Sequence, residues 1–313
     1  MPPDPTLSLA KGSASLAAFS DPILVDPRPA LLTEVVDAYR AAAPDLVEPN
    51  LAALRAAARG DGDPLAAPNL PSLTVLATDR AVDAATARFR PASRLAALVE
   101  AGVCELLALE TTQPNTALGG REDGCVLVEA ETGGRAGDES EAGKRERDGT
   151  ARRWCRVGGD PTLRDRYASL VDEATAHRLR TPSRHRAYGA FRERCGEALA
   201  ADVVRVLDAR PESSEVAGAD PLDLGGARVR AYAVGARRSA LDGALRRACE
   251  DAGIGSRATF TRIKRELREA ELVDTEAVPQ RIGRPRERLV ARGALADADG
   301  PEAIVAAVRG AIE

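Results

Sequence analysis

Apolar and polar positions in the first half of the chain alternate between short strand-like runs and longer helix-like stripes. Compact apolar runs predict strands at Ile23–Val25, Ser72–Ala77 and Val103–Leu109. Between these runs, apolar side chains recur every three or four residues and predict helices at Pro29–Ala43, Leu46–Arg59 and Arg80–Ala101, the last with Pro91 as a kink. Strand, helix and strand in succession form a βαβ-like unit. This half of the chain therefore predicts an α/β fold.

The middle of the chain predicts a hairpin interrupted by a long polar segment. The strands of this hairpin are Gly124–Ala130 and Trp154–Val157. Residues 132–150 between them are charged and carry no apolar period, so we expect a disordered insertion. Helices follow at Pro161–Ala176 and Arg186–Leu207, and then a polar, Pro-bearing stretch from residue 209 to residue 221 predicts a linker.

After Leu222 the pattern changes to short amphipathic helices joined by tight turns. Ile254 is the apolar side chain that plugs one of these turns, and Ser256 is suited to cap the helix that follows, because its hydroxyl can accept from a free backbone N–H. Helix, turn, helix and β-hairpin in this order predict a winged helix-turn-helix. The expected elements are helices at Leu224–Gly235, Ser239–Ala252 and Arg257–Ala270, strands at Leu272–Pro279 and Arg286–Arg292, and a C-terminal helix at Pro301–Ile312.

The domain organisation that follows from these patterns has four parts. We expect an α/β (α+β) N-terminal domain followed by a C-terminal winged helix-turn-helix domain. The expected boundaries are a flexible N-terminus at 1–20, a sensor or dimerisation domain at 21–178, a helical connector and linker at 179–221, and the winged helix-turn-helix with its C-terminal helix at 222–313.

The helix predicted at 256–270 has the pattern of a recognition helix. Phe260, Ile263 and Leu267 are spaced to face a core, which leaves polar and basic side chains on the outside. Arginine pairs bidentately with guanine in the major groove, whereas more lateral basic residues reach phosphates. Thr261, Arg262 and Arg265 are best placed for base edges, and Lys264 and Arg268 for phosphates. The candidate DNA-binding residues of this helix are Ser256, Arg257, Thr259, Thr261, Arg262, Lys264, Arg265 and Arg268.

The hairpin after this helix has an arginine-rich tip, at residues 280–288. A Gly-Arg-Pro sequence at the tip is slim enough for a minor groove, where arginine meets enhanced negative potential. We therefore expect this wing to lie on the minor groove or on the DNA backbone. Its candidate DNA-binding residues are Arg281, Gly283, Arg284, Arg286 and Arg288.

The distribution of charge agrees with a DNA-binding module. Residues 227–292 contain 16 Arg and Lys against 9 Asp and Glu, a net charge of +7. Because the whole chain carries −4, the remainder carries −11. A basic module on an acidic protein attracts the phosphate backbone, while the acidic remainder limits non-specific adhesion.

The C-terminal residues resemble a known family. The stretch that runs from GIGSRATFTRIKRELREAELVD to TEAVPQRIGRPRERL is similar to the C-terminal domain of the haloarchaeal TbsP family of transcriptional regulators, at Ala258–Arg262, Thr275–Pro279 and Ile282–Arg286. The phrases ILVDPRPALLTEVVDAY and FRPASRLAALVEAG also resemble that family. The departures are the insertion at 132–150, the loop at 60–71, and Glu271, where a Gly commonly ends the recognition helix.

The resemblance implies a DNA-binding regulator whose N-terminal α/β domain is similar to the phospholipase-D-like sensor domains of TrmB-type regulators. Phospholipase-D-type catalysis needs a histidine nucleophile, and no histidine precedes His177. The stretch Gly137–Arg145 superficially resembles a phosphate-binding loop, but it has one intervening residue too many and Arg145 stands in place of the hydroxyl residue. We therefore expect no enzyme and no cofactor.

The cysteines and the hydropathy exclude further classes. The five cysteines are widely separated and form no CxxC pair, so we expect reduced, mostly buried thiols and no metal site. Cys104, on a predicted strand, is expected to be buried and not nucleophilic. No apolar run approaches the roughly 20 residues that cross a bilayer, and we expect a cytoplasmic protein without a membrane partner.

Together these features predict a sequence-specific transcriptional regulator that binds double-stranded DNA at promoters. Two alternatives stay open: a winged-helix adaptor for a protein partner, and, with less support, an enzyme in the N-terminal domain. A small-molecule effector and a homodimer are further expectations, because paired winged helices read two half-sites.

Overall fold

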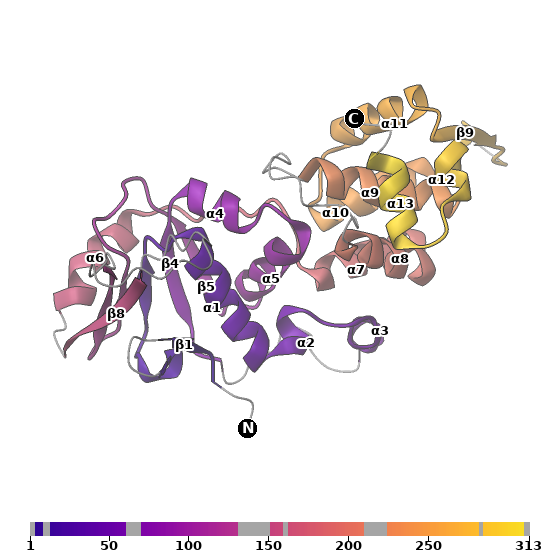
Figure 1. Cartoon of the computed structure of the whole chain (residues 1–313). Helices are drawn as coiled ribbons and strands as arrows, with labels where there is room; N and C mark the ends of the chain where they lie inside the picture. Colours follow the sequence, from indigo (N-terminus) through magenta and orange to yellow (C-terminus); the bar gives the residue numbers. More distant parts are fainter. Residues whose placement is uncertain are drawn as a thin grey trace, which may run out of the picture. The chain divides into compact units, whose positions relative to one another are not determined.

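The computed structural model describes residues 4–8, 13–60, 70–130, 151–158, 162–209, 224–281 and 284–309. Its contacts divide the chain into two compact units: residues 1–42, 69–81 and 103–177 form the first, and residues 43–68, 82–102 and 178–313 form the second. Figure 1 labels the helices and strands. The expected insertion at 132–150, most of the expected linker at 209–221 and Gly283 of the wing lie outside the described residues.

A six-stranded sheet, in the order β5-β4-β3-β6-β7-β8, forms the centre of the first unit. The strands β3, β4 and β5 are parallel, and β6, β7 and β8 continue as an antiparallel meander. The bounds are β3 (Ile23–Val25), β4 (Leu73–Ala77), β5 (Cys104–Ala108), β6 (Ala117–Gly119), β7 (Gly124–Ala130) and β8 (Ala151–Gly158). The expected α/β fold and its hairpin are confirmed. The strand β6 was not predicted, because it is only three residues long and has no recognisable pattern.

The helix α6 (Thr162–Glu173) covers one face of this sheet. Its Leu163 and Tyr167 pack against alternate strand residues, among them Ile23 and Val25, which share one face because strand side chains alternate. A methyl group on Gly124 would lie only 2.5 Å from Leu163 Cδ2, so glycine allows the helix to approach β7 closely. The other elements of this unit are β1 (Thr6–Ser8), β2 (Ser13–Ser15), η1 (Leu16–Ala18) and α1 (Pro29–Ala42), and α4 (Asp79–Ala85) spans the boundary between the units.

The second unit is mainly helical. One apolar core runs through it, and the aromatic side chains Phe89, Tyr188, Phe191, Tyr232 and Phe260 contribute to that core. The bounds are α2 (Pro44–Val47), α3 (Leu51–Ala58), α5 (Phe89–Glu100), α7 (Arg184–Cys195), α8 (Glu197–Asp208), α9 (Leu224–Arg237), α10 (Asp242–Ala252), α11 (Arg257–Glu269), β9 (Val273–Val278), β10 (Arg286–Ala291), α12 (Gly293–Asp297) and α13 (Pro301–Arg309).

Three helices expected from the sequence are each two helices. The one expected at 46–59 is α2 and α3, which are separated by residues 48–50. The helix expected at 80–101 ends at Ala85, and a new helix begins at Phe89. Pro91 is therefore the third residue of α5, where its missing N–H needs no partner, and it marks a beginning rather than a kink. The helix expected at 186–207 is interrupted at Gly196, whose φ of 91° no helix can contain.

The thiols are free, as expected. Cys104, Cys125 and Cys249 are buried, whereas Cys155 is exposed. Burial raises the pKa of Cys104 to about 12, which keeps this thiol protonated and unreactive. Among the described residues, no helix combines the length and apolarity needed to cross a membrane, and no cluster of metal-ligating side chains is found.

Candidate nucleic-acid interface

The turn between α10 and α11 has the geometry of a helix-turn-helix. Gly253 follows α10 with a φ of 80°, and its N–H donates to the carbonyl of Glu250 at 2.9 Å. The N–H of Ile254 donates to the carbonyl of Cys249 at 2.9 Å, which completes a Schellman motif. The side chain of Ile254 is buried, as expected for a plug. Ser256 then caps α11, because its hydroxyl accepts from the N–H of Thr259.

The helix α11 separates an apolar face from a basic one. Phe260, Ile263 and Leu267 are buried, which confirms the expected core stripe. On the outside, the side chains of Arg262 and Arg265 are 64% and 70% exposed. Among the described residues, each forms an ion pair only with a glutamate one turn further along the helix, at 3.4 and 3.8 Å. Such exposed pairs contribute about 0.3–0.5 kcal/mol each, so a phosphate or a base can replace them.

The side chains in the first turns of α11 already have local partners. The Thr259 hydroxyl lies 3.1 Å from that of Ser256 in the cap, and Arg257 pairs with Glu250 at 2.9 Å. Thr261 accepts a hydrogen bond of 2.8 Å from Arg246 of α10. These residues lie at the N-terminal end of α11, where the sequence analysis expected base contacts. Their polar groups also stabilise the turn.

Lys264 differs from its basic neighbours. Its side chain is only 16% exposed, and its Nζ lies 3.2 Å from Asp242 Oδ2 and 2.6 Å from Glu287 Oε2. A phosphate would have to displace two carboxylates to reach this ammonium group. The structure therefore provides a structural partner for Lys264 where the sequence suggested a phosphate contact.

Asp242 lies at the centre of a cluster that ties four elements together. Its carboxylate accepts from the Tyr232 hydroxyl of α9, from Arg246 of α10 at 2.9 Å and from Lys264 of α11, which also bonds Glu287 of β10. Burial raises the pKa of Asp242, but the hydrogen bond from Tyr232 and the charges of Arg246 and Lys264 outweigh it and lower the pKa overall. Tyr232 also stacks on Phe260, with ring centroids 6.0 Å apart. The sequence gives no local signal for this cluster, because its members come from separate elements.

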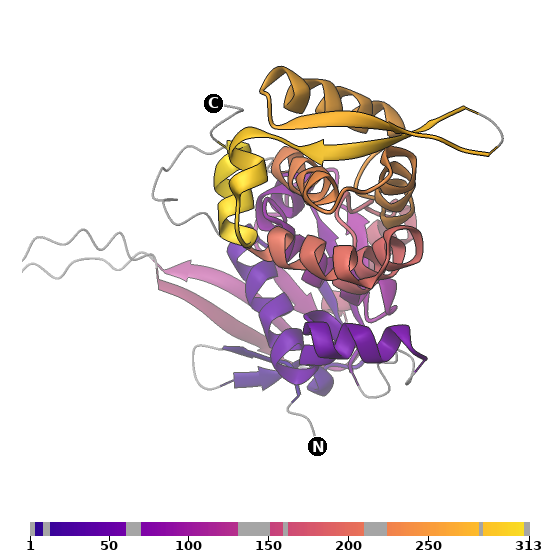
Figure 2. The ribbon, with the colours of Figure 1, turned by 90° about the vertical axis from the view of Figure 1, so that its right-hand side faces the viewer.

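The wing is an antiparallel hairpin in which Arg286 pairs with Val278 and Arg288 with Glu276. In Figure 2 the hairpin extends away from the helices of its own unit. An isolated bridge between Leu241 and Arg288 and a 2.9 Å hydrogen bond from the N–H of Leu289 to the carbonyl of Ala240 fasten its base. The exposed arginines of the wing are Arg281, Arg284, Arg286 and Arg288.

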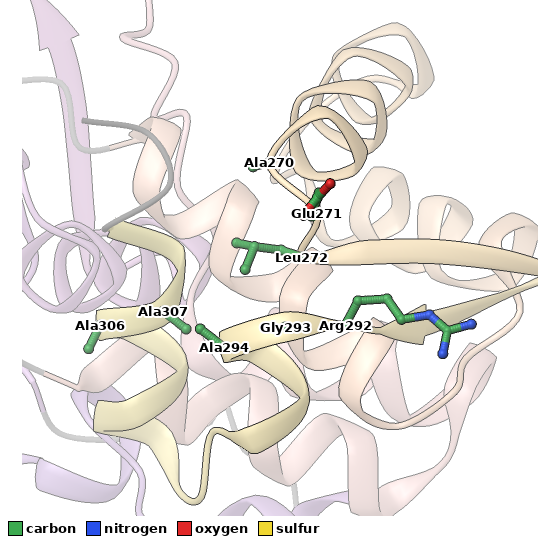
Figure 3. A pocket seen from close by; sticks show the side chains of 8 residues that line it. All are labelled: Ala270, Glu271, Leu272, Arg292, Gly293, Ala294, Ala306 and Ala307. Atoms are coloured by element: carbon green, nitrogen blue, oxygen red, sulfur yellow. The ribbon is translucent and has the colours of Figure 1, made fainter.

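A hollow of about 630 Å³ lies at the opposite end of α11 from the turn, and Figure 3 shows its lining. Small apolar side chains dominate, with Arg292 and Glu271 as the charged members. In Figure 3 the Arg292 side chain is directed along the hairpin, and its Nη2 lies 3.9 Å from Asp274 Oδ2. The lining residues are Ala270, Glu271, Leu272, Arg292, Gly293, Ala294, Ala306 and Ala307. This hollow is separate from the basic face formed by Arg262 and Arg265.

A capped turn, an outward basic helix and a wing fastened beside it are the parts of a DNA-binding helix-turn-helix. Residues 183–309 match the model of a family described as "Transcriptional regulator TbsP-like, C-terminal HTH domain". The match covers 127 of the 313 residues, and over this range the chain is similar to that domain. The resemblance expected from the sequence is confirmed over these residues, and the match supports a DNA-binding regulator of transcription. Neither the search of curated proteins nor that of solved structures returned a match.

The TbsP-like domain begins earlier than the winged helix itself. The match starts at residue 183, so it includes α7 and α8, which share one apolar core with α9, α10 and α11. Tyr188, Phe191 and Val203 are buried in that core. The sequence predicted a single connector helix in this region. The structure has α7 and α8 there, and both pack in the same unit as the winged helix.

Proposed function

We propose that the protein is a sequence-specific transcriptional regulator that inserts α11 into the major groove and lays the wing on the minor groove or the backbone. The exposed, weakly paired guanidinium groups of Arg262 and Arg265 carry this proposal. They stand on the helix face opposite the core, on a family domain of DNA-binding regulators. An arginine in that position can donate two hydrogen bonds to guanine.

The remaining basic side chains divide by environment. Arg268 is exposed and pairs at 3.6 Å with Asp274, so we assign it a phosphate contact. Arg284, next to Gly283 at the wing tip, is the residue we assign to the minor groove. Lys264 is left out of the proposed interface because Asp242 and Glu287 hold it.

The proposed partner is double-stranded DNA in promoter regions. A homodimer would let two copies of α11 read two half-sites, and the first unit is the proposed place for dimer contacts or for a small-molecule effector. We also propose that the protein acts in the cytoplasm of a haloarchaeon, which rests on the TbsP resemblance, and that it is not an enzyme.

Chromatin immunoprecipitation with sequencing of the tagged protein tests the function. An Arg262→Ala, Arg265→Ala double variant is compared with wild type. An Arg205→Ala, Arg238→Ala variant is the matched control, because it removes the same charge from two half-exposed arginines that pair with Asp202 instead. We expect sharp promoter peaks for wild type and control, and their loss in the first variant.

The opposite results separate the alternatives. Peaks that persist in the Arg262→Ala, Arg265→Ala variant would show that DNA is read by another surface. No enrichment for wild type under any growth condition would favour a winged-helix adaptor, and a search for protein partners would follow.

A further inference from the structure

Two arginines from outside α11 donate to backbone carbonyls on either side of the turn between α10 and α11. Arg186 of α7 donates from Nε to the carbonyl of Asp251, 3.3 Å away. Arg228 of α9 donates from Nε to the carbonyl of Ile254, 2.7 Å away. A methyl group on Gly253, between these two carbonyls, would lie 3.8 Å from Arg186 Nη2. Both guanidinium groups are therefore held beside the turn.

Nearby carboxylates do not neutralise this charge. The two that immediately precede the turn are already paired, Glu250 with Arg257 at 2.9 Å and Asp251 with Arg194 at 2.8 Å. In the part of the chain that the structure describes, neither Arg186 nor Arg228 forms an ion pair with a carboxylate. Each uses its Nε–H on a carbonyl, which leaves its Nη donors for a further acceptor.

More positive charge gathers around Arg228. Its side chain is half-buried, and burial, followed by the charges of Arg180 and Arg262, lowers its pKa. Like charges raise the free energy of a site, and an incoming anion lowers it again. Arg262 belongs to the outward face of α11, so its charge links the turn to the recognition helix electrostatically.

We infer that Arg186 and Arg228 each bind a backbone phosphate of DNA at the α10–α11 turn. The inference rests on the proposed function and adds contacts that do not depend on the base sequence of the DNA. Guanidinium groups bind phosphate through paired N–H donors, and phosphate contacts fix the register of a recognition helix on the duplex. Arg186 and Arg228 thereby set how Arg262 meets the bases.

Salt dependence on a mixed-sequence duplex of about 30 base pairs tests this, because a phosphate contact is independent of sequence. Fluorescence anisotropy gives the affinity of the full chain between roughly 50 and 200 mM salt for wild type, Arg186→Gln and Arg228→Gln. Arg237→Gln is the matched control: Arg237 also donates to a backbone carbonyl, that of Ala296 at 2.6 Å, but lies about 14 Å along α9 from Arg228.

For each of the first two variants we expect the slope of log affinity against log salt to fall by about 0.9, the value for one lost phosphate contact. Across that salt range the loss of affinity then becomes about three- to fourfold smaller than for wild type. The slope of Arg237→Gln stays at the wild-type value.

Further variants separate folding from binding. Arg186 is exposed, so its replacement leaves the core intact, and Arg228→Lys keeps the charge and restores the slope even if the turn loosens. Wild-type slopes for both Arg186→Gln and Arg228→Gln would overturn the inference and leave the proposed function standing. Failure of the wild-type chain to bind any duplex would overturn both.

Discussion

The two sides of α11 both carry basic side chains, but these differ in exposure and in the burial of their ion-pair partners. On the outward face, Arg262 and Arg265 are exposed and meet only neighbouring glutamates of the same helix. On the inward side, Lys264 reaches a carboxylate, Asp242, whose side chain is only 10% exposed. A basic side chain that pairs with a buried carboxylate stabilises the fold, whereas one that pairs with an exposed carboxylate remains available to a ligand. Burial of the partner is therefore what distinguishes the two sides.

The largest effect on stability is expected from Asp242→Ala. This change leaves Arg246 and Lys264 without their shared carboxylate, and breaking a buried pair costs about 3–5 kcal/mol in the free energy of unfolding. Urea unfolding followed by circular dichroism measures the loss, because most helices belong to the second unit. The sole tryptophan, Trp154, lies in the first unit, and its fluorescence reports on that unit as an internal control.

An unchanged circular dichroism midpoint for Asp242→Ala would contradict the role given to the buried carboxylate. Asp202→Ala is the matched control, because Asp202 pairs with Arg205 and Arg238, both about half exposed. We expect this control to lose about 1 kcal/mol or less.

Acid should weaken the inward cluster next. The pKa of Asp242 is lowered in the folded chain, so its contribution to stability is present above the unfolded value of about 3.9 and is lost as pH falls below it. Tyr232, Arg246 and Lys264 are the groups that face this carboxylate. Unfolding midpoints between about pH 5 and pH 2 should fall more steeply for wild type than for Asp242→Asn. Parallel curves would assign the acid sensitivity to other carboxylates.

A matched pair of variants on α11 sharpens the comparison further. Lys264→Ala should lower the free energy of unfolding by about 1–2 kcal/mol and change DNA affinity little. Arg265→Ala should do the reverse, with a stability change within about 0.5 kcal/mol and a loss of about 1–3 kcal/mol in operator binding. Thermal unfolding and anisotropy on the same preparations check both. Equal losses of affinity for the two variants would remove the distinction between the faces.

The smallest expected effect comes from the backbone at the C-terminal end of α11. It involves neither the outward arginines nor the Asp242 cluster. Glu271 lies two residues beyond the end of α11 and has a φ of 56°, and its N–H donates to the carbonyl of Arg268 at 3.0 Å. A side chain in this left-handed region costs about 1–2 kcal/mol, which glycine avoids at some cost in entropy. Glu271→Gly should therefore raise the free energy of unfolding by about 0.5–1 kcal/mol in urea. Its counterpart is Gly253→Ala, which should lower stability by a similar amount; a gain there would argue against the backbone explanation.

Local signals in the sequence predicted most of the C-terminal domain. The Ser256 cap, the turn at Gly253 and the stripe of Phe260, Ile263 and Leu267 each depend on residues within a few positions of one another. Such features follow from helix geometry alone, and the structure confirms them. The departure at Glu271 was visible too, and its positive φ explains why a glycine is usual at such a position.

Features that depend on distant residues could not be predicted. Lysine is usually a surface residue, so the sequence did not predict that Lys264 is mostly buried. Its partners Asp242 and Glu287 are distant in sequence, and only the fold brings them close to it. The same holds for Arg186, which precedes the turn it contacts by 65 positions. Periodicity also failed at Gly196 and Pro91, where a continuous apolar stripe concealed the end of one helix and the start of another.

The alternating assignment of chain segments to the two units has a consequence for how such a regulator can be recombined. The boundaries fall after Ala42, Pro68, Ala81, Gly102 and His177, so the polypeptide passes from one unit to the other five times. A gene fragment that starts at residue 222 would carry the winged helix without α5, α7 and α8, and would leave apolar surface of α9 uncovered. Exchange of DNA specificity between relatives is thus easier through substitutions on α11 than through shuffling of whole coding segments.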